Sequence, residues 1–175
     1  MNATAKGSSK KGTGKLQVST PSDREIAMTR TFDAPRGMVF DAFTKPELVK
    51  RWLGAFGGWK FEVCEIDLTV GGKYRYVWRG ADGSKLAMGG VYREIKRPER
   101  IVATEKFDDP WYEGDAEDTT LFIEKDGKTT VTTIVRYASR AIRDAVLKSP
   151  MEGGVAKSYD KLAEVLASMP ARREK

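Results

Sequence analysis

The chain has 175 residues, with 31 Lys and Arg, 25 Asp and Glu, one Cys and no His. Without an imidazole side chain it has no Ser-His-Asp or Cys-His nucleophile system and no His-ligated metal. Its single cysteine, Cys64, excludes an internal disulfide and a Cys-X-X-Cys redox pair. The length suits one domain that is large enough to hold a core with a ligand cavity.

The net charge of +6 lies mostly at the two ends of the chain. Residues 1–23 hold four Lys against one Asp, residues 170–175 hold three basic side chains against one Glu, and the remainder carries only +1. Proteins that bind nucleic acids usually gather Lys and Arg on one structured face. We therefore expect no nucleic-acid partner.

The N-terminal segment has four Lys, no acidic residue and no apolar run within residues 1–15. Such a composition buries too little surface to offset the entropy of ordering the chain. We predict a disordered basic tail at residues 1–22, one domain at residues 23–169 and a flexible basic C-terminus at residues 170–175. No apolar stretch suits a secretory signal or a membrane span, so we expect a cytoplasmic protein with no membrane association.

The first regular elements of the domain are a strand and two short helices. Residues 24–32 alternate imperfectly between apolar and polar side chains, which predicts a half-buried strand. Pro35 suits the first turn of a short helix, and Lys45-Pro46 ends that helix. A second short helix is expected at residues 47–52, before a glycine-rich loop.

A run of strands separated by turn residues follows. Gly-Gly, Asp-Gly and Pro-containing pairs punctuate the run, and Asp126-Gly127 is a strong hairpin signal. Strands joined by such short turns are antiparallel, because parallel neighbours need long crossovers. The predicted strands span residues 59–68, 73–79, 85–96, 100–107, 119–125 and 129–137.

The chain closes with helices. A short one is expected at residues 141–147, and Ser149-Pro150 suits the start of a longer one, which Pro170 ends. Apolar side chains recur at helical spacing along one side of the longer helix, and the concave face of a sheet would bury that side. We predict an α+β fold, in which a curved antiparallel sheet of about six to seven strands wraps around a long C-terminal helix, with two short helices after the first strand.

Several short motifs, in order along the chain, resemble a known family. They are TFDAP at residues 31–35, VFDAFT at 39–44, DLTVGG at 67–72, GGVY at 89–92, PERI at 98–101, RDAVLKS at 143–149 and MEGG at 151–154. Together with the order of elements, they resemble the SRPBCC or START-like (Bet v 1-like) superfamily, in the bacterial branch similar to the C-terminal domain of the activator of Hsp90 ATPase. The resemblance covers residues 24–169 and implies a helix-grip fold with a deep apolar cavity between the sheet and the last helix.

The candidate ligand-binding residues are those whose strand or helix parity, or place in a loop, would direct them toward this cavity. In residues 73–79, for example, the aromatic side chains share one face and the basic ones share the other. Packing in a solid core is the alternative for each apolar member. The candidates are Tyr76, Trp78, Met88, Tyr92, Glu105, Phe107, Trp111, Leu121, Thr133, Met151, Val155 and Tyr159.

Glu105 is the most informative candidate, because it shares the parity of Ile101, Ala103 and Phe107. A carboxylate on such a face must be paired, protonated or hydrated. Pairing with an inward Arg such as Arg136, exposure at the end of the sheet, and a functional role are the alternatives.

Catalysis is the rival to simple binding. Aromatase/cyclase members of the superfamily fold polyketide chains with Tyr, Arg and acidic groups in the pocket. Here Glu105 with Tyr76, Tyr92 or Tyr159 could supply a proton donor and acceptor. Because nothing in the sequence fixes their mutual geometry, we assign no catalytic residue, and we expect no cofactor and no metal.

Residues 108–118 pack six acids around Trp111 and Tyr112. Their spacing does not match a calcium-binding EF-hand loop. We expect a solvated loop that gates the cavity, with Trp111 or Tyr112 folding over its mouth.

Cys64 alternates with apolar neighbours and is expected to be a buried, inert thiol.

The leading hypothesis is that the protein binds a small hydrophobic ligand and has no assigned catalysis. The alternatives are a polyketide cyclase/aromatase-like enzyme and, from the resemblance, an Hsp90 co-chaperone-like interaction module. The expected partner is a small hydrophobic molecule, with a chaperone and a second copy of the chain as further candidates.

Overall fold

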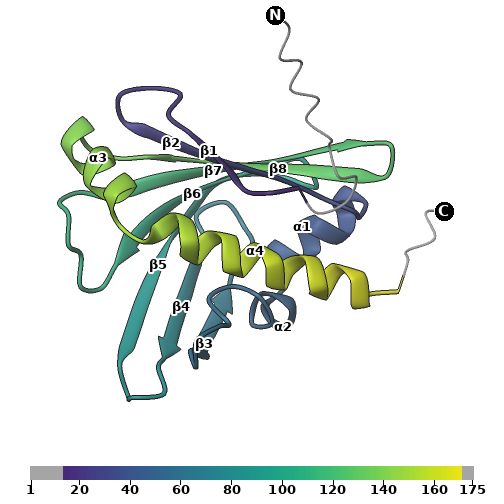
Figure 1. Ribbon diagram of the computed structural model, residues 1–175, viewed down its shortest axis with the longest axis horizontal. Helices are drawn as coiled ribbons and strands as arrows, with labels where there is room; N and C mark the ends of the chain where they lie inside the picture. Colours follow the sequence, from purple (N-terminus) through teal and green to yellow (C-terminus); the bar gives the residue numbers. More distant parts are fainter. Residues whose placement is uncertain (1–13, 171–175) are drawn as a thin grey trace, which may run out of the picture.

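The computed structural model describes residues 14–170 and confirms the predicted helix-grip architecture. An antiparallel sheet curves around the long C-terminal helix α4, Met151–Ser168 (Figure 1). Two short helices, α1 (Arg36–Thr44) and α2 (Pro46–Val49), follow the first long strand, as predicted. Helix α3, Arg140–Lys148, links the last strand to α4.

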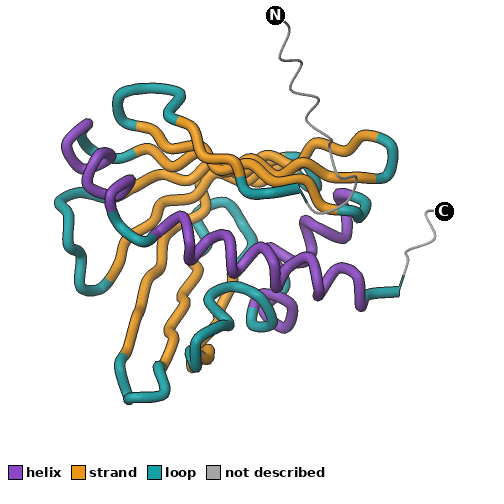
Figure 2. The backbone as a smooth tube through the Cα atoms, viewed as in Figure 1, coloured by secondary structure: helices purple, strands orange, loops and turns teal. Residues whose placement is uncertain are grey.

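Eight strands form the sheet, where six to seven were predicted. Their order is β1-β2-β8-β7-β6-β5-β4-β3, and every neighbouring pair is antiparallel. Figure 2 distinguishes the strands of the sheet from the helices and the connecting loops. The strands are β1 Gln17–Ser19, β2 Glu25–Phe32, β3 Lys60–Ile66, β4 Lys73–Arg79, β5 Lys85–Lys96, β6 Arg100–Phe107, β7 Ala116–Lys125 and β8 Lys128–Arg136.

Strand β1 was not predicted, because it lies inside the segment expected to be a disordered tail, residues 1–22. It pairs with β2, from Gln17 opposite Thr29 to Ser19 opposite Ala27. Three residues are too few to show a period-two pattern, and the pairing satisfies backbone groups at the edge of β2. The rest of the predicted tail, up to residue 13, and the C-terminal residues 171–175 lie outside the described residues.

The middle of β5 comes unusually close to its neighbours. A Cβ added to Gly90 would overlap the carbonyl oxygen of Thr104 on β6 and would lie 2.9 Å from the Tyr74 ring on β4. A β-bulge between residues 92 and 94 adds local twist to the same strand. Glycine at this position therefore allows the close approach of strands on the cavity side of the sheet.

The solid part of the core lies at the end of the molecule where α1 packs on the sheet. Phe32, Phe40, Phe122 and Leu162 are fully buried there. Phe40 and Phe122 meet edge to face, with ring centroids 5.3 Å apart. Leu162 comes from the C-terminal half of α4, so this half is packed into the core while the N-terminal half covers the cavity described below.

One ion pair joins α4 to the sheet. Arg30 on β2 donates from Nη1 to Oδ1 of Asp160 on α4 at 2.7 Å, and its guanidinium lies 5.4 Å from the centroid of the Phe32 ring. The Arg30 side chain is buried whereas Asp160 is exposed. None of the helices within residues 14–170 is long and apolar enough to cross a membrane.

Candidate functional site

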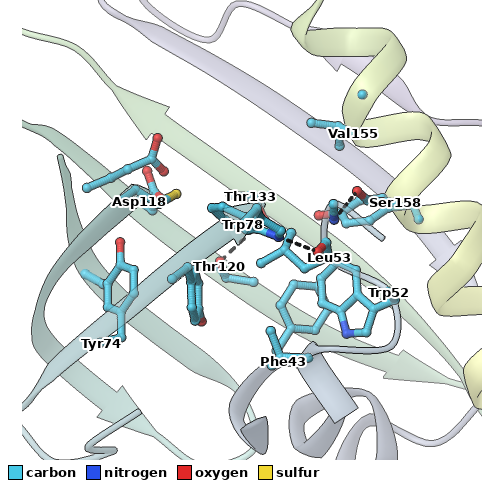
Figure 3. Close-up of a pocket in the computed structure, with 18 of the residues that line it drawn as sticks. Phe43, Trp52, Leu53, Tyr74, Trp78, Asp118, Thr120, Thr133, Val155 and Ser158 are labelled. Carbon is cyan, nitrogen blue, oxygen red and sulfur yellow. Dashed lines mark hydrogen bonds between the residues drawn. The ribbon is translucent and has the colours of Figure 1, made fainter. Parts of the chain in front are cut away.

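A cavity of about 530 Å³ lies between the N-terminal half of α4, the inner face of the sheet and the loop after α2 (Figure 3). Most of the side chains around it are aliphatic or aromatic. Its volume falls within the range of about 300–1,000 Å³ that is typical of small-molecule sites. Ten of the predicted residues line it: Tyr76, Trp78, Met88, Tyr92, Glu105, Phe107, Thr133, Met151, Val155 and Tyr159.

Strand β4 supplies an aromatic wall. Tyr74, Tyr76 and Trp78 share the inner face, as the alternation in the sequence predicted. Neighbouring rings are in contact, with centroids 5.0 Å apart for the two tyrosines and 5.8 Å apart for Tyr76 and Trp78. Trp78 Nε1 donates to the carbonyl of Leu53 at 2.9 Å, and the Tyr74 hydroxyl donates to that of Thr104 at 2.7 Å. These bonds fix the rings and leave their apolar surfaces toward the cavity.

Other tyrosine side chains interact with one another or with a threonine. The side chain of Tyr76 interacts with that of Tyr92, and the side chain of Tyr159 interacts with that of Thr133. Burial raises the pKa of all three tyrosines, so they stay neutral across the physiological range. They can therefore act on a ligand as uncharged hydrogen-bonding groups.

The wall opposite β4 combines α4 with the loop after α2. The Gly54 amide donates to Ser158 Oγ of α4 at 3.0 Å. Gly54 has a φ of +67°, and a Cβ there would lie 2.7 Å from Trp78 Nε1, so glycine is required at this position. Phe43 and Trp52 close the same end of the cavity, with ring centroids 4.8 Å apart.

Two carboxyl groups form the most polar part of the lining. Asp118 on β7 lies opposite Ala103 on β6, and Glu105 is two residues further along the same face, which makes the two acids diagonal neighbours. Burial raises the pKa of Asp118 well above its usual range, and the charge of Glu105 and hydrogen bonding to it raise this pKa further. Apart from the Glu105 carboxyl group, no N–H or O–H donor among the described residues bonds to the buried Oδ1 of Asp118.

Of the alternatives for Glu105, pairing with Arg136 is not found among the described residues. Arg136 is exposed at the end of β8, opposite Glu25 and Glu117 on the neighbouring strands. Within residues 14–170, no Lys or Arg forms an ion pair with Glu105 or Asp118. The two carboxyl groups therefore interact with each other and have no cationic partner among the described residues.

Leu121 is not in the cavity. The pairing of β6 with β7 places Thr120 opposite Ile101, so Thr120 and Asp118 face inward and Leu121 faces the other side of the sheet. Ile123, on the same parity as Leu121, is 59 % exposed. The sequence offered three successive apolar residues here, and parity alone did not show which of them faces inward.

Trp111 does not line the cavity either. Its side chain is 56 % exposed, and its ring packs edge to face against Tyr112, with centroids 5.2 Å apart. The acidic segment also ends earlier than expected, since β7 begins at Ala116 and includes Asp118. Asp118 thus belongs to the sheet and not to a solvated loop.

The candidate ligand-binding residues predicted from the sequence did not include several residues that line the cavity. These lining residues include Met28, Phe43, Trp52, Leu53, Phe56, Tyr74, Asp118, Thr120 and Ser158. The parity of Tyr74 with Tyr76 was a usable signal for one of them, whereas the residues from α1 and from the loop after α2 depend on tertiary packing. Among the described residues, no group of three or more acidic or Cys side chains is arranged to hold a metal ion.

Cys64 lies outside the cavity lining and is buried, as predicted. Its thiol is 3.9 Å from the carbonyl oxygen of Pro46. Burial raises the pKa of this thiol to about 11. The thiolate is therefore scarce at neutral pH, which fits a packing role.

A curved antiparallel sheet that grips a C-terminal helix over an apolar cavity defines a START-like protein of the SRPBCC superfamily. Residues 33–167 match the family described as "Activator of Hsp90 ATPase homolog 1-like protein", and the chain belongs to this family. No protein with a curated functional description matches its sequence.

Solved structures support the same assignment. A protein from Rhodobacter sphaeroides is 28 % identical, with a TM-score of 0.84 over 89 % of this chain and 100 % of that chain. A protein from Chromobacterium violaceum is also 28 % identical, with a TM-score of 0.70 over 85 % of this chain and 100 % of that chain. An Hsp90 activator from Plasmodium falciparum is 25 % identical, with a TM-score of 0.61 over 82 % of this chain and 96 % of that chain.

Proposed function

We propose that the protein binds a small hydrophobic ligand in the cavity beneath α4. The observation that supports this most directly is the cavity itself, about 530 Å³ inside a domain of ordinary size. Protein interiors are close-packed and contain few voids larger than a water molecule. A space of this size is therefore far larger than a packing defect.

The lining favours an apolar occupant. Aromatic rings from β4, Met and Val side chains from α4 and the Phe43–Trp52 pair provide most of the wall. Water gains few hydrogen bonds along these walls, because they expose few polar atoms to the cavity. An apolar molecule of matching size would replace that water and gain contacts on every side.

Blocking the cavity tests the proposal. Val155→Trp would place an indole from α4 into the cavity, whereas Ala167→Trp adds the same side chain to an exposed position of the same helix. We expect the neutral apolar dye Nile red to bind the wild type and the Ala167 variant saturably, and the Val155 variant at least roughly tenfold more weakly. Absence of saturable binding to the wild type, or equal binding by the two variants, would contradict the proposal.

An interaction with an Hsp90-type chaperone is the second candidate. It is supported by the family match and by the similarity to the Hsp90 activator from Plasmodium falciparum. Adding the protein to purified Hsp90 and measuring ATP hydrolysis tests it. A stimulated rate would support this candidate, and an unchanged rate without complex formation would exclude it.

A further inference from the structure

Glu105 and Asp118 place two carboxyl groups in a cavity whose lining is otherwise mostly apolar. Burying a carboxylate without a counter-charge is costly, and proteins normally pair such a group with Lys or Arg. The two buried arginines of the described residues are bonded elsewhere, Arg30 to Asp160 and Arg143 to Asp144. Among the described residues nothing cationic meets the pair, so the cavity presents an unmatched acidic site.

Building on the proposed ligand-binding function, we propose that the cavity selects hydrophobic molecules that carry one cationic head, such as a primary ammonium group, and seats that head against Glu105 and Asp118. Two adjacent carboxyl groups tend to share one proton and keep one negative charge, because two ionised groups would repel each other. A single cation matches that charge. It would also supply an N–H donor to the buried Oδ1 of Asp118.

The surroundings of the pair suit a cation in a second way. Tyr74 lies beside Asp118 and belongs to a cluster of rings, with centroids 5.0 Å from Tyr76 and 5.5 Å from Tyr92. Aromatic rings attract cations through their quadrupole. Tyr112 and Tyr137 also lie near the pair, and burial and the charge of Glu105 raise the pKa of both hydroxyls, so they stay neutral. The charge of Glu117 acts on Asp118 as well, and it is negative. Among the described residues, no Lys or Arg is paired with either acid.

The cavity also fixes the direction in which such a molecule lies. In Figure 3, Asp118 and Tyr74 occupy one end of the site, and Phe43 and Trp52 occupy the other. A ligand with its head at the acidic end would extend its apolar body past Trp78 and Thr133 toward the Phe43–Trp52 pair. An anionic head is disfavoured at the acidic end by repulsion and finds no free cation at the other end among the lining residues.

A matched series of ligands tests the inference. Naphthylethylamine, naphthylethanol and naphthylacetate share one apolar body and carry a cationic, a neutral and an anionic head. Their affinities are measured by isothermal titration calorimetry with wild type, with Asp118→Asn, with Glu105→Gln/Asp118→Asn and with Glu117→Gln. The last variant removes an exposed acid from β7, the strand that carries Asp118, and controls for general surface charge.

We expect the wild type and Glu117→Gln to bind the amine at least roughly tenfold more tightly than the alcohol, and the anion most weakly. The double variant should bind amine and alcohol equally, and Asp118→Asn alone should reduce the preference. If the wild type binds alcohol as tightly as amine, or if the double variant keeps the preference, the inference is wrong while the proposed function stands. If none of the three compounds binds the wild type, both are wrong. The comparison of ligands on the wild type decides the matter even where a variant fails to fold.

Discussion

Replacing Asp118 with Asn removes an ionisable group from the cavity wall at nearly constant size. In the folded protein the pKa of Asp118 is raised well above its usual range, first by burial and then by Glu105. In the unfolded chain this pKa returns to about 3.9. The folded state therefore binds more protons at this residue than the unfolded state does. The resulting stabilisation is complete below the unfolded pKa and is lost as pH rises through the folded pKa.

The magnitude follows from proton linkage. Between the two pKa values, this residue lowers the free energy of unfolding of the wild type by up to about 1.4 kcal/mol per pH unit. The Asn variant lacks this loss, so its stability relative to the wild type increases as pH rises. With a urea m-value of about 1–3 kcal/mol/M, the gap between the two unfolding midpoints would widen by roughly 0.5–1.4 M for each pH unit in that window.

Urea unfolding followed by far-ultraviolet circular dichroism, from about pH 5 to about pH 8, measures this gap. Glu124→Gln is the matched control, since Glu124 lies at the other end of the same strand, opposite Thr129. Its difference from the wild type should stay nearly constant over the same range. A constant difference for Asp118→Asn as well, or a loss of its relative stability at higher pH, would refute the reasoning.

Three further predictions concern packing. Leu162→Ala, at a fully buried site in α4, should lower the free energy of unfolding by about 2–5 kcal/mol, and Leu147→Ala, at an exposed site, by less than about 1 kcal/mol. Equal losses in chemical denaturation would contradict the packing of α4. Gly153→Ala adds a methyl group in open space on that helix and should raise the free energy of unfolding by about 0.5–1 kcal/mol, whereas Gly90→Ala should lower it. A Gly90 variant as stable as the wild type would argue against the close approach of β5 and β6. Because burial raises the pKa of Cys64 to about 11, its thiol should react with a disulfide reagent at least roughly tenfold more slowly in the native protein than in urea. Equal reaction rates would contradict its burial.

The aromatic wall of the site could be predicted from the sequence because β4 alternates without interruption. Tyr74, Tyr76 and Trp78 fall on one parity, and Gly-Gly and Asp-Gly turns mark both ends of the strand. Local chemistry of this kind decides which face a residue occupies. The order of the strands and helices could also be predicted from the sequence, and it led to the correct fold.

The acidic end of the site could not be predicted, because it depends on strand pairing. In β7, Leu121, Phe122 and Ile123 are consecutive apolar residues, and parity alone cannot say which of them is buried. The structure buries Phe122 and exposes Ile123, which turns Asp118 inward. A shift of one residue in such a strand exchanges its two faces, so an error in parity replaced Asp118 by Leu121 in the predicted site.

The position of the tryptophans gives the protein a built-in optical reporter. Trp52, Trp59 and Trp78 line the cavity, whereas Trp111, the fourth tryptophan of the chain, is exposed and lies outside it. In a Trp111→Phe variant, all indole emission would come from the wall of the cavity. Replacement of water by an apolar occupant changes the polarity that these indoles sense, and with it the wavelength of their emission. Occupancy of the site is thus a spectroscopic property of the unlabelled protein, which can be followed in real time as a ligand enters or leaves.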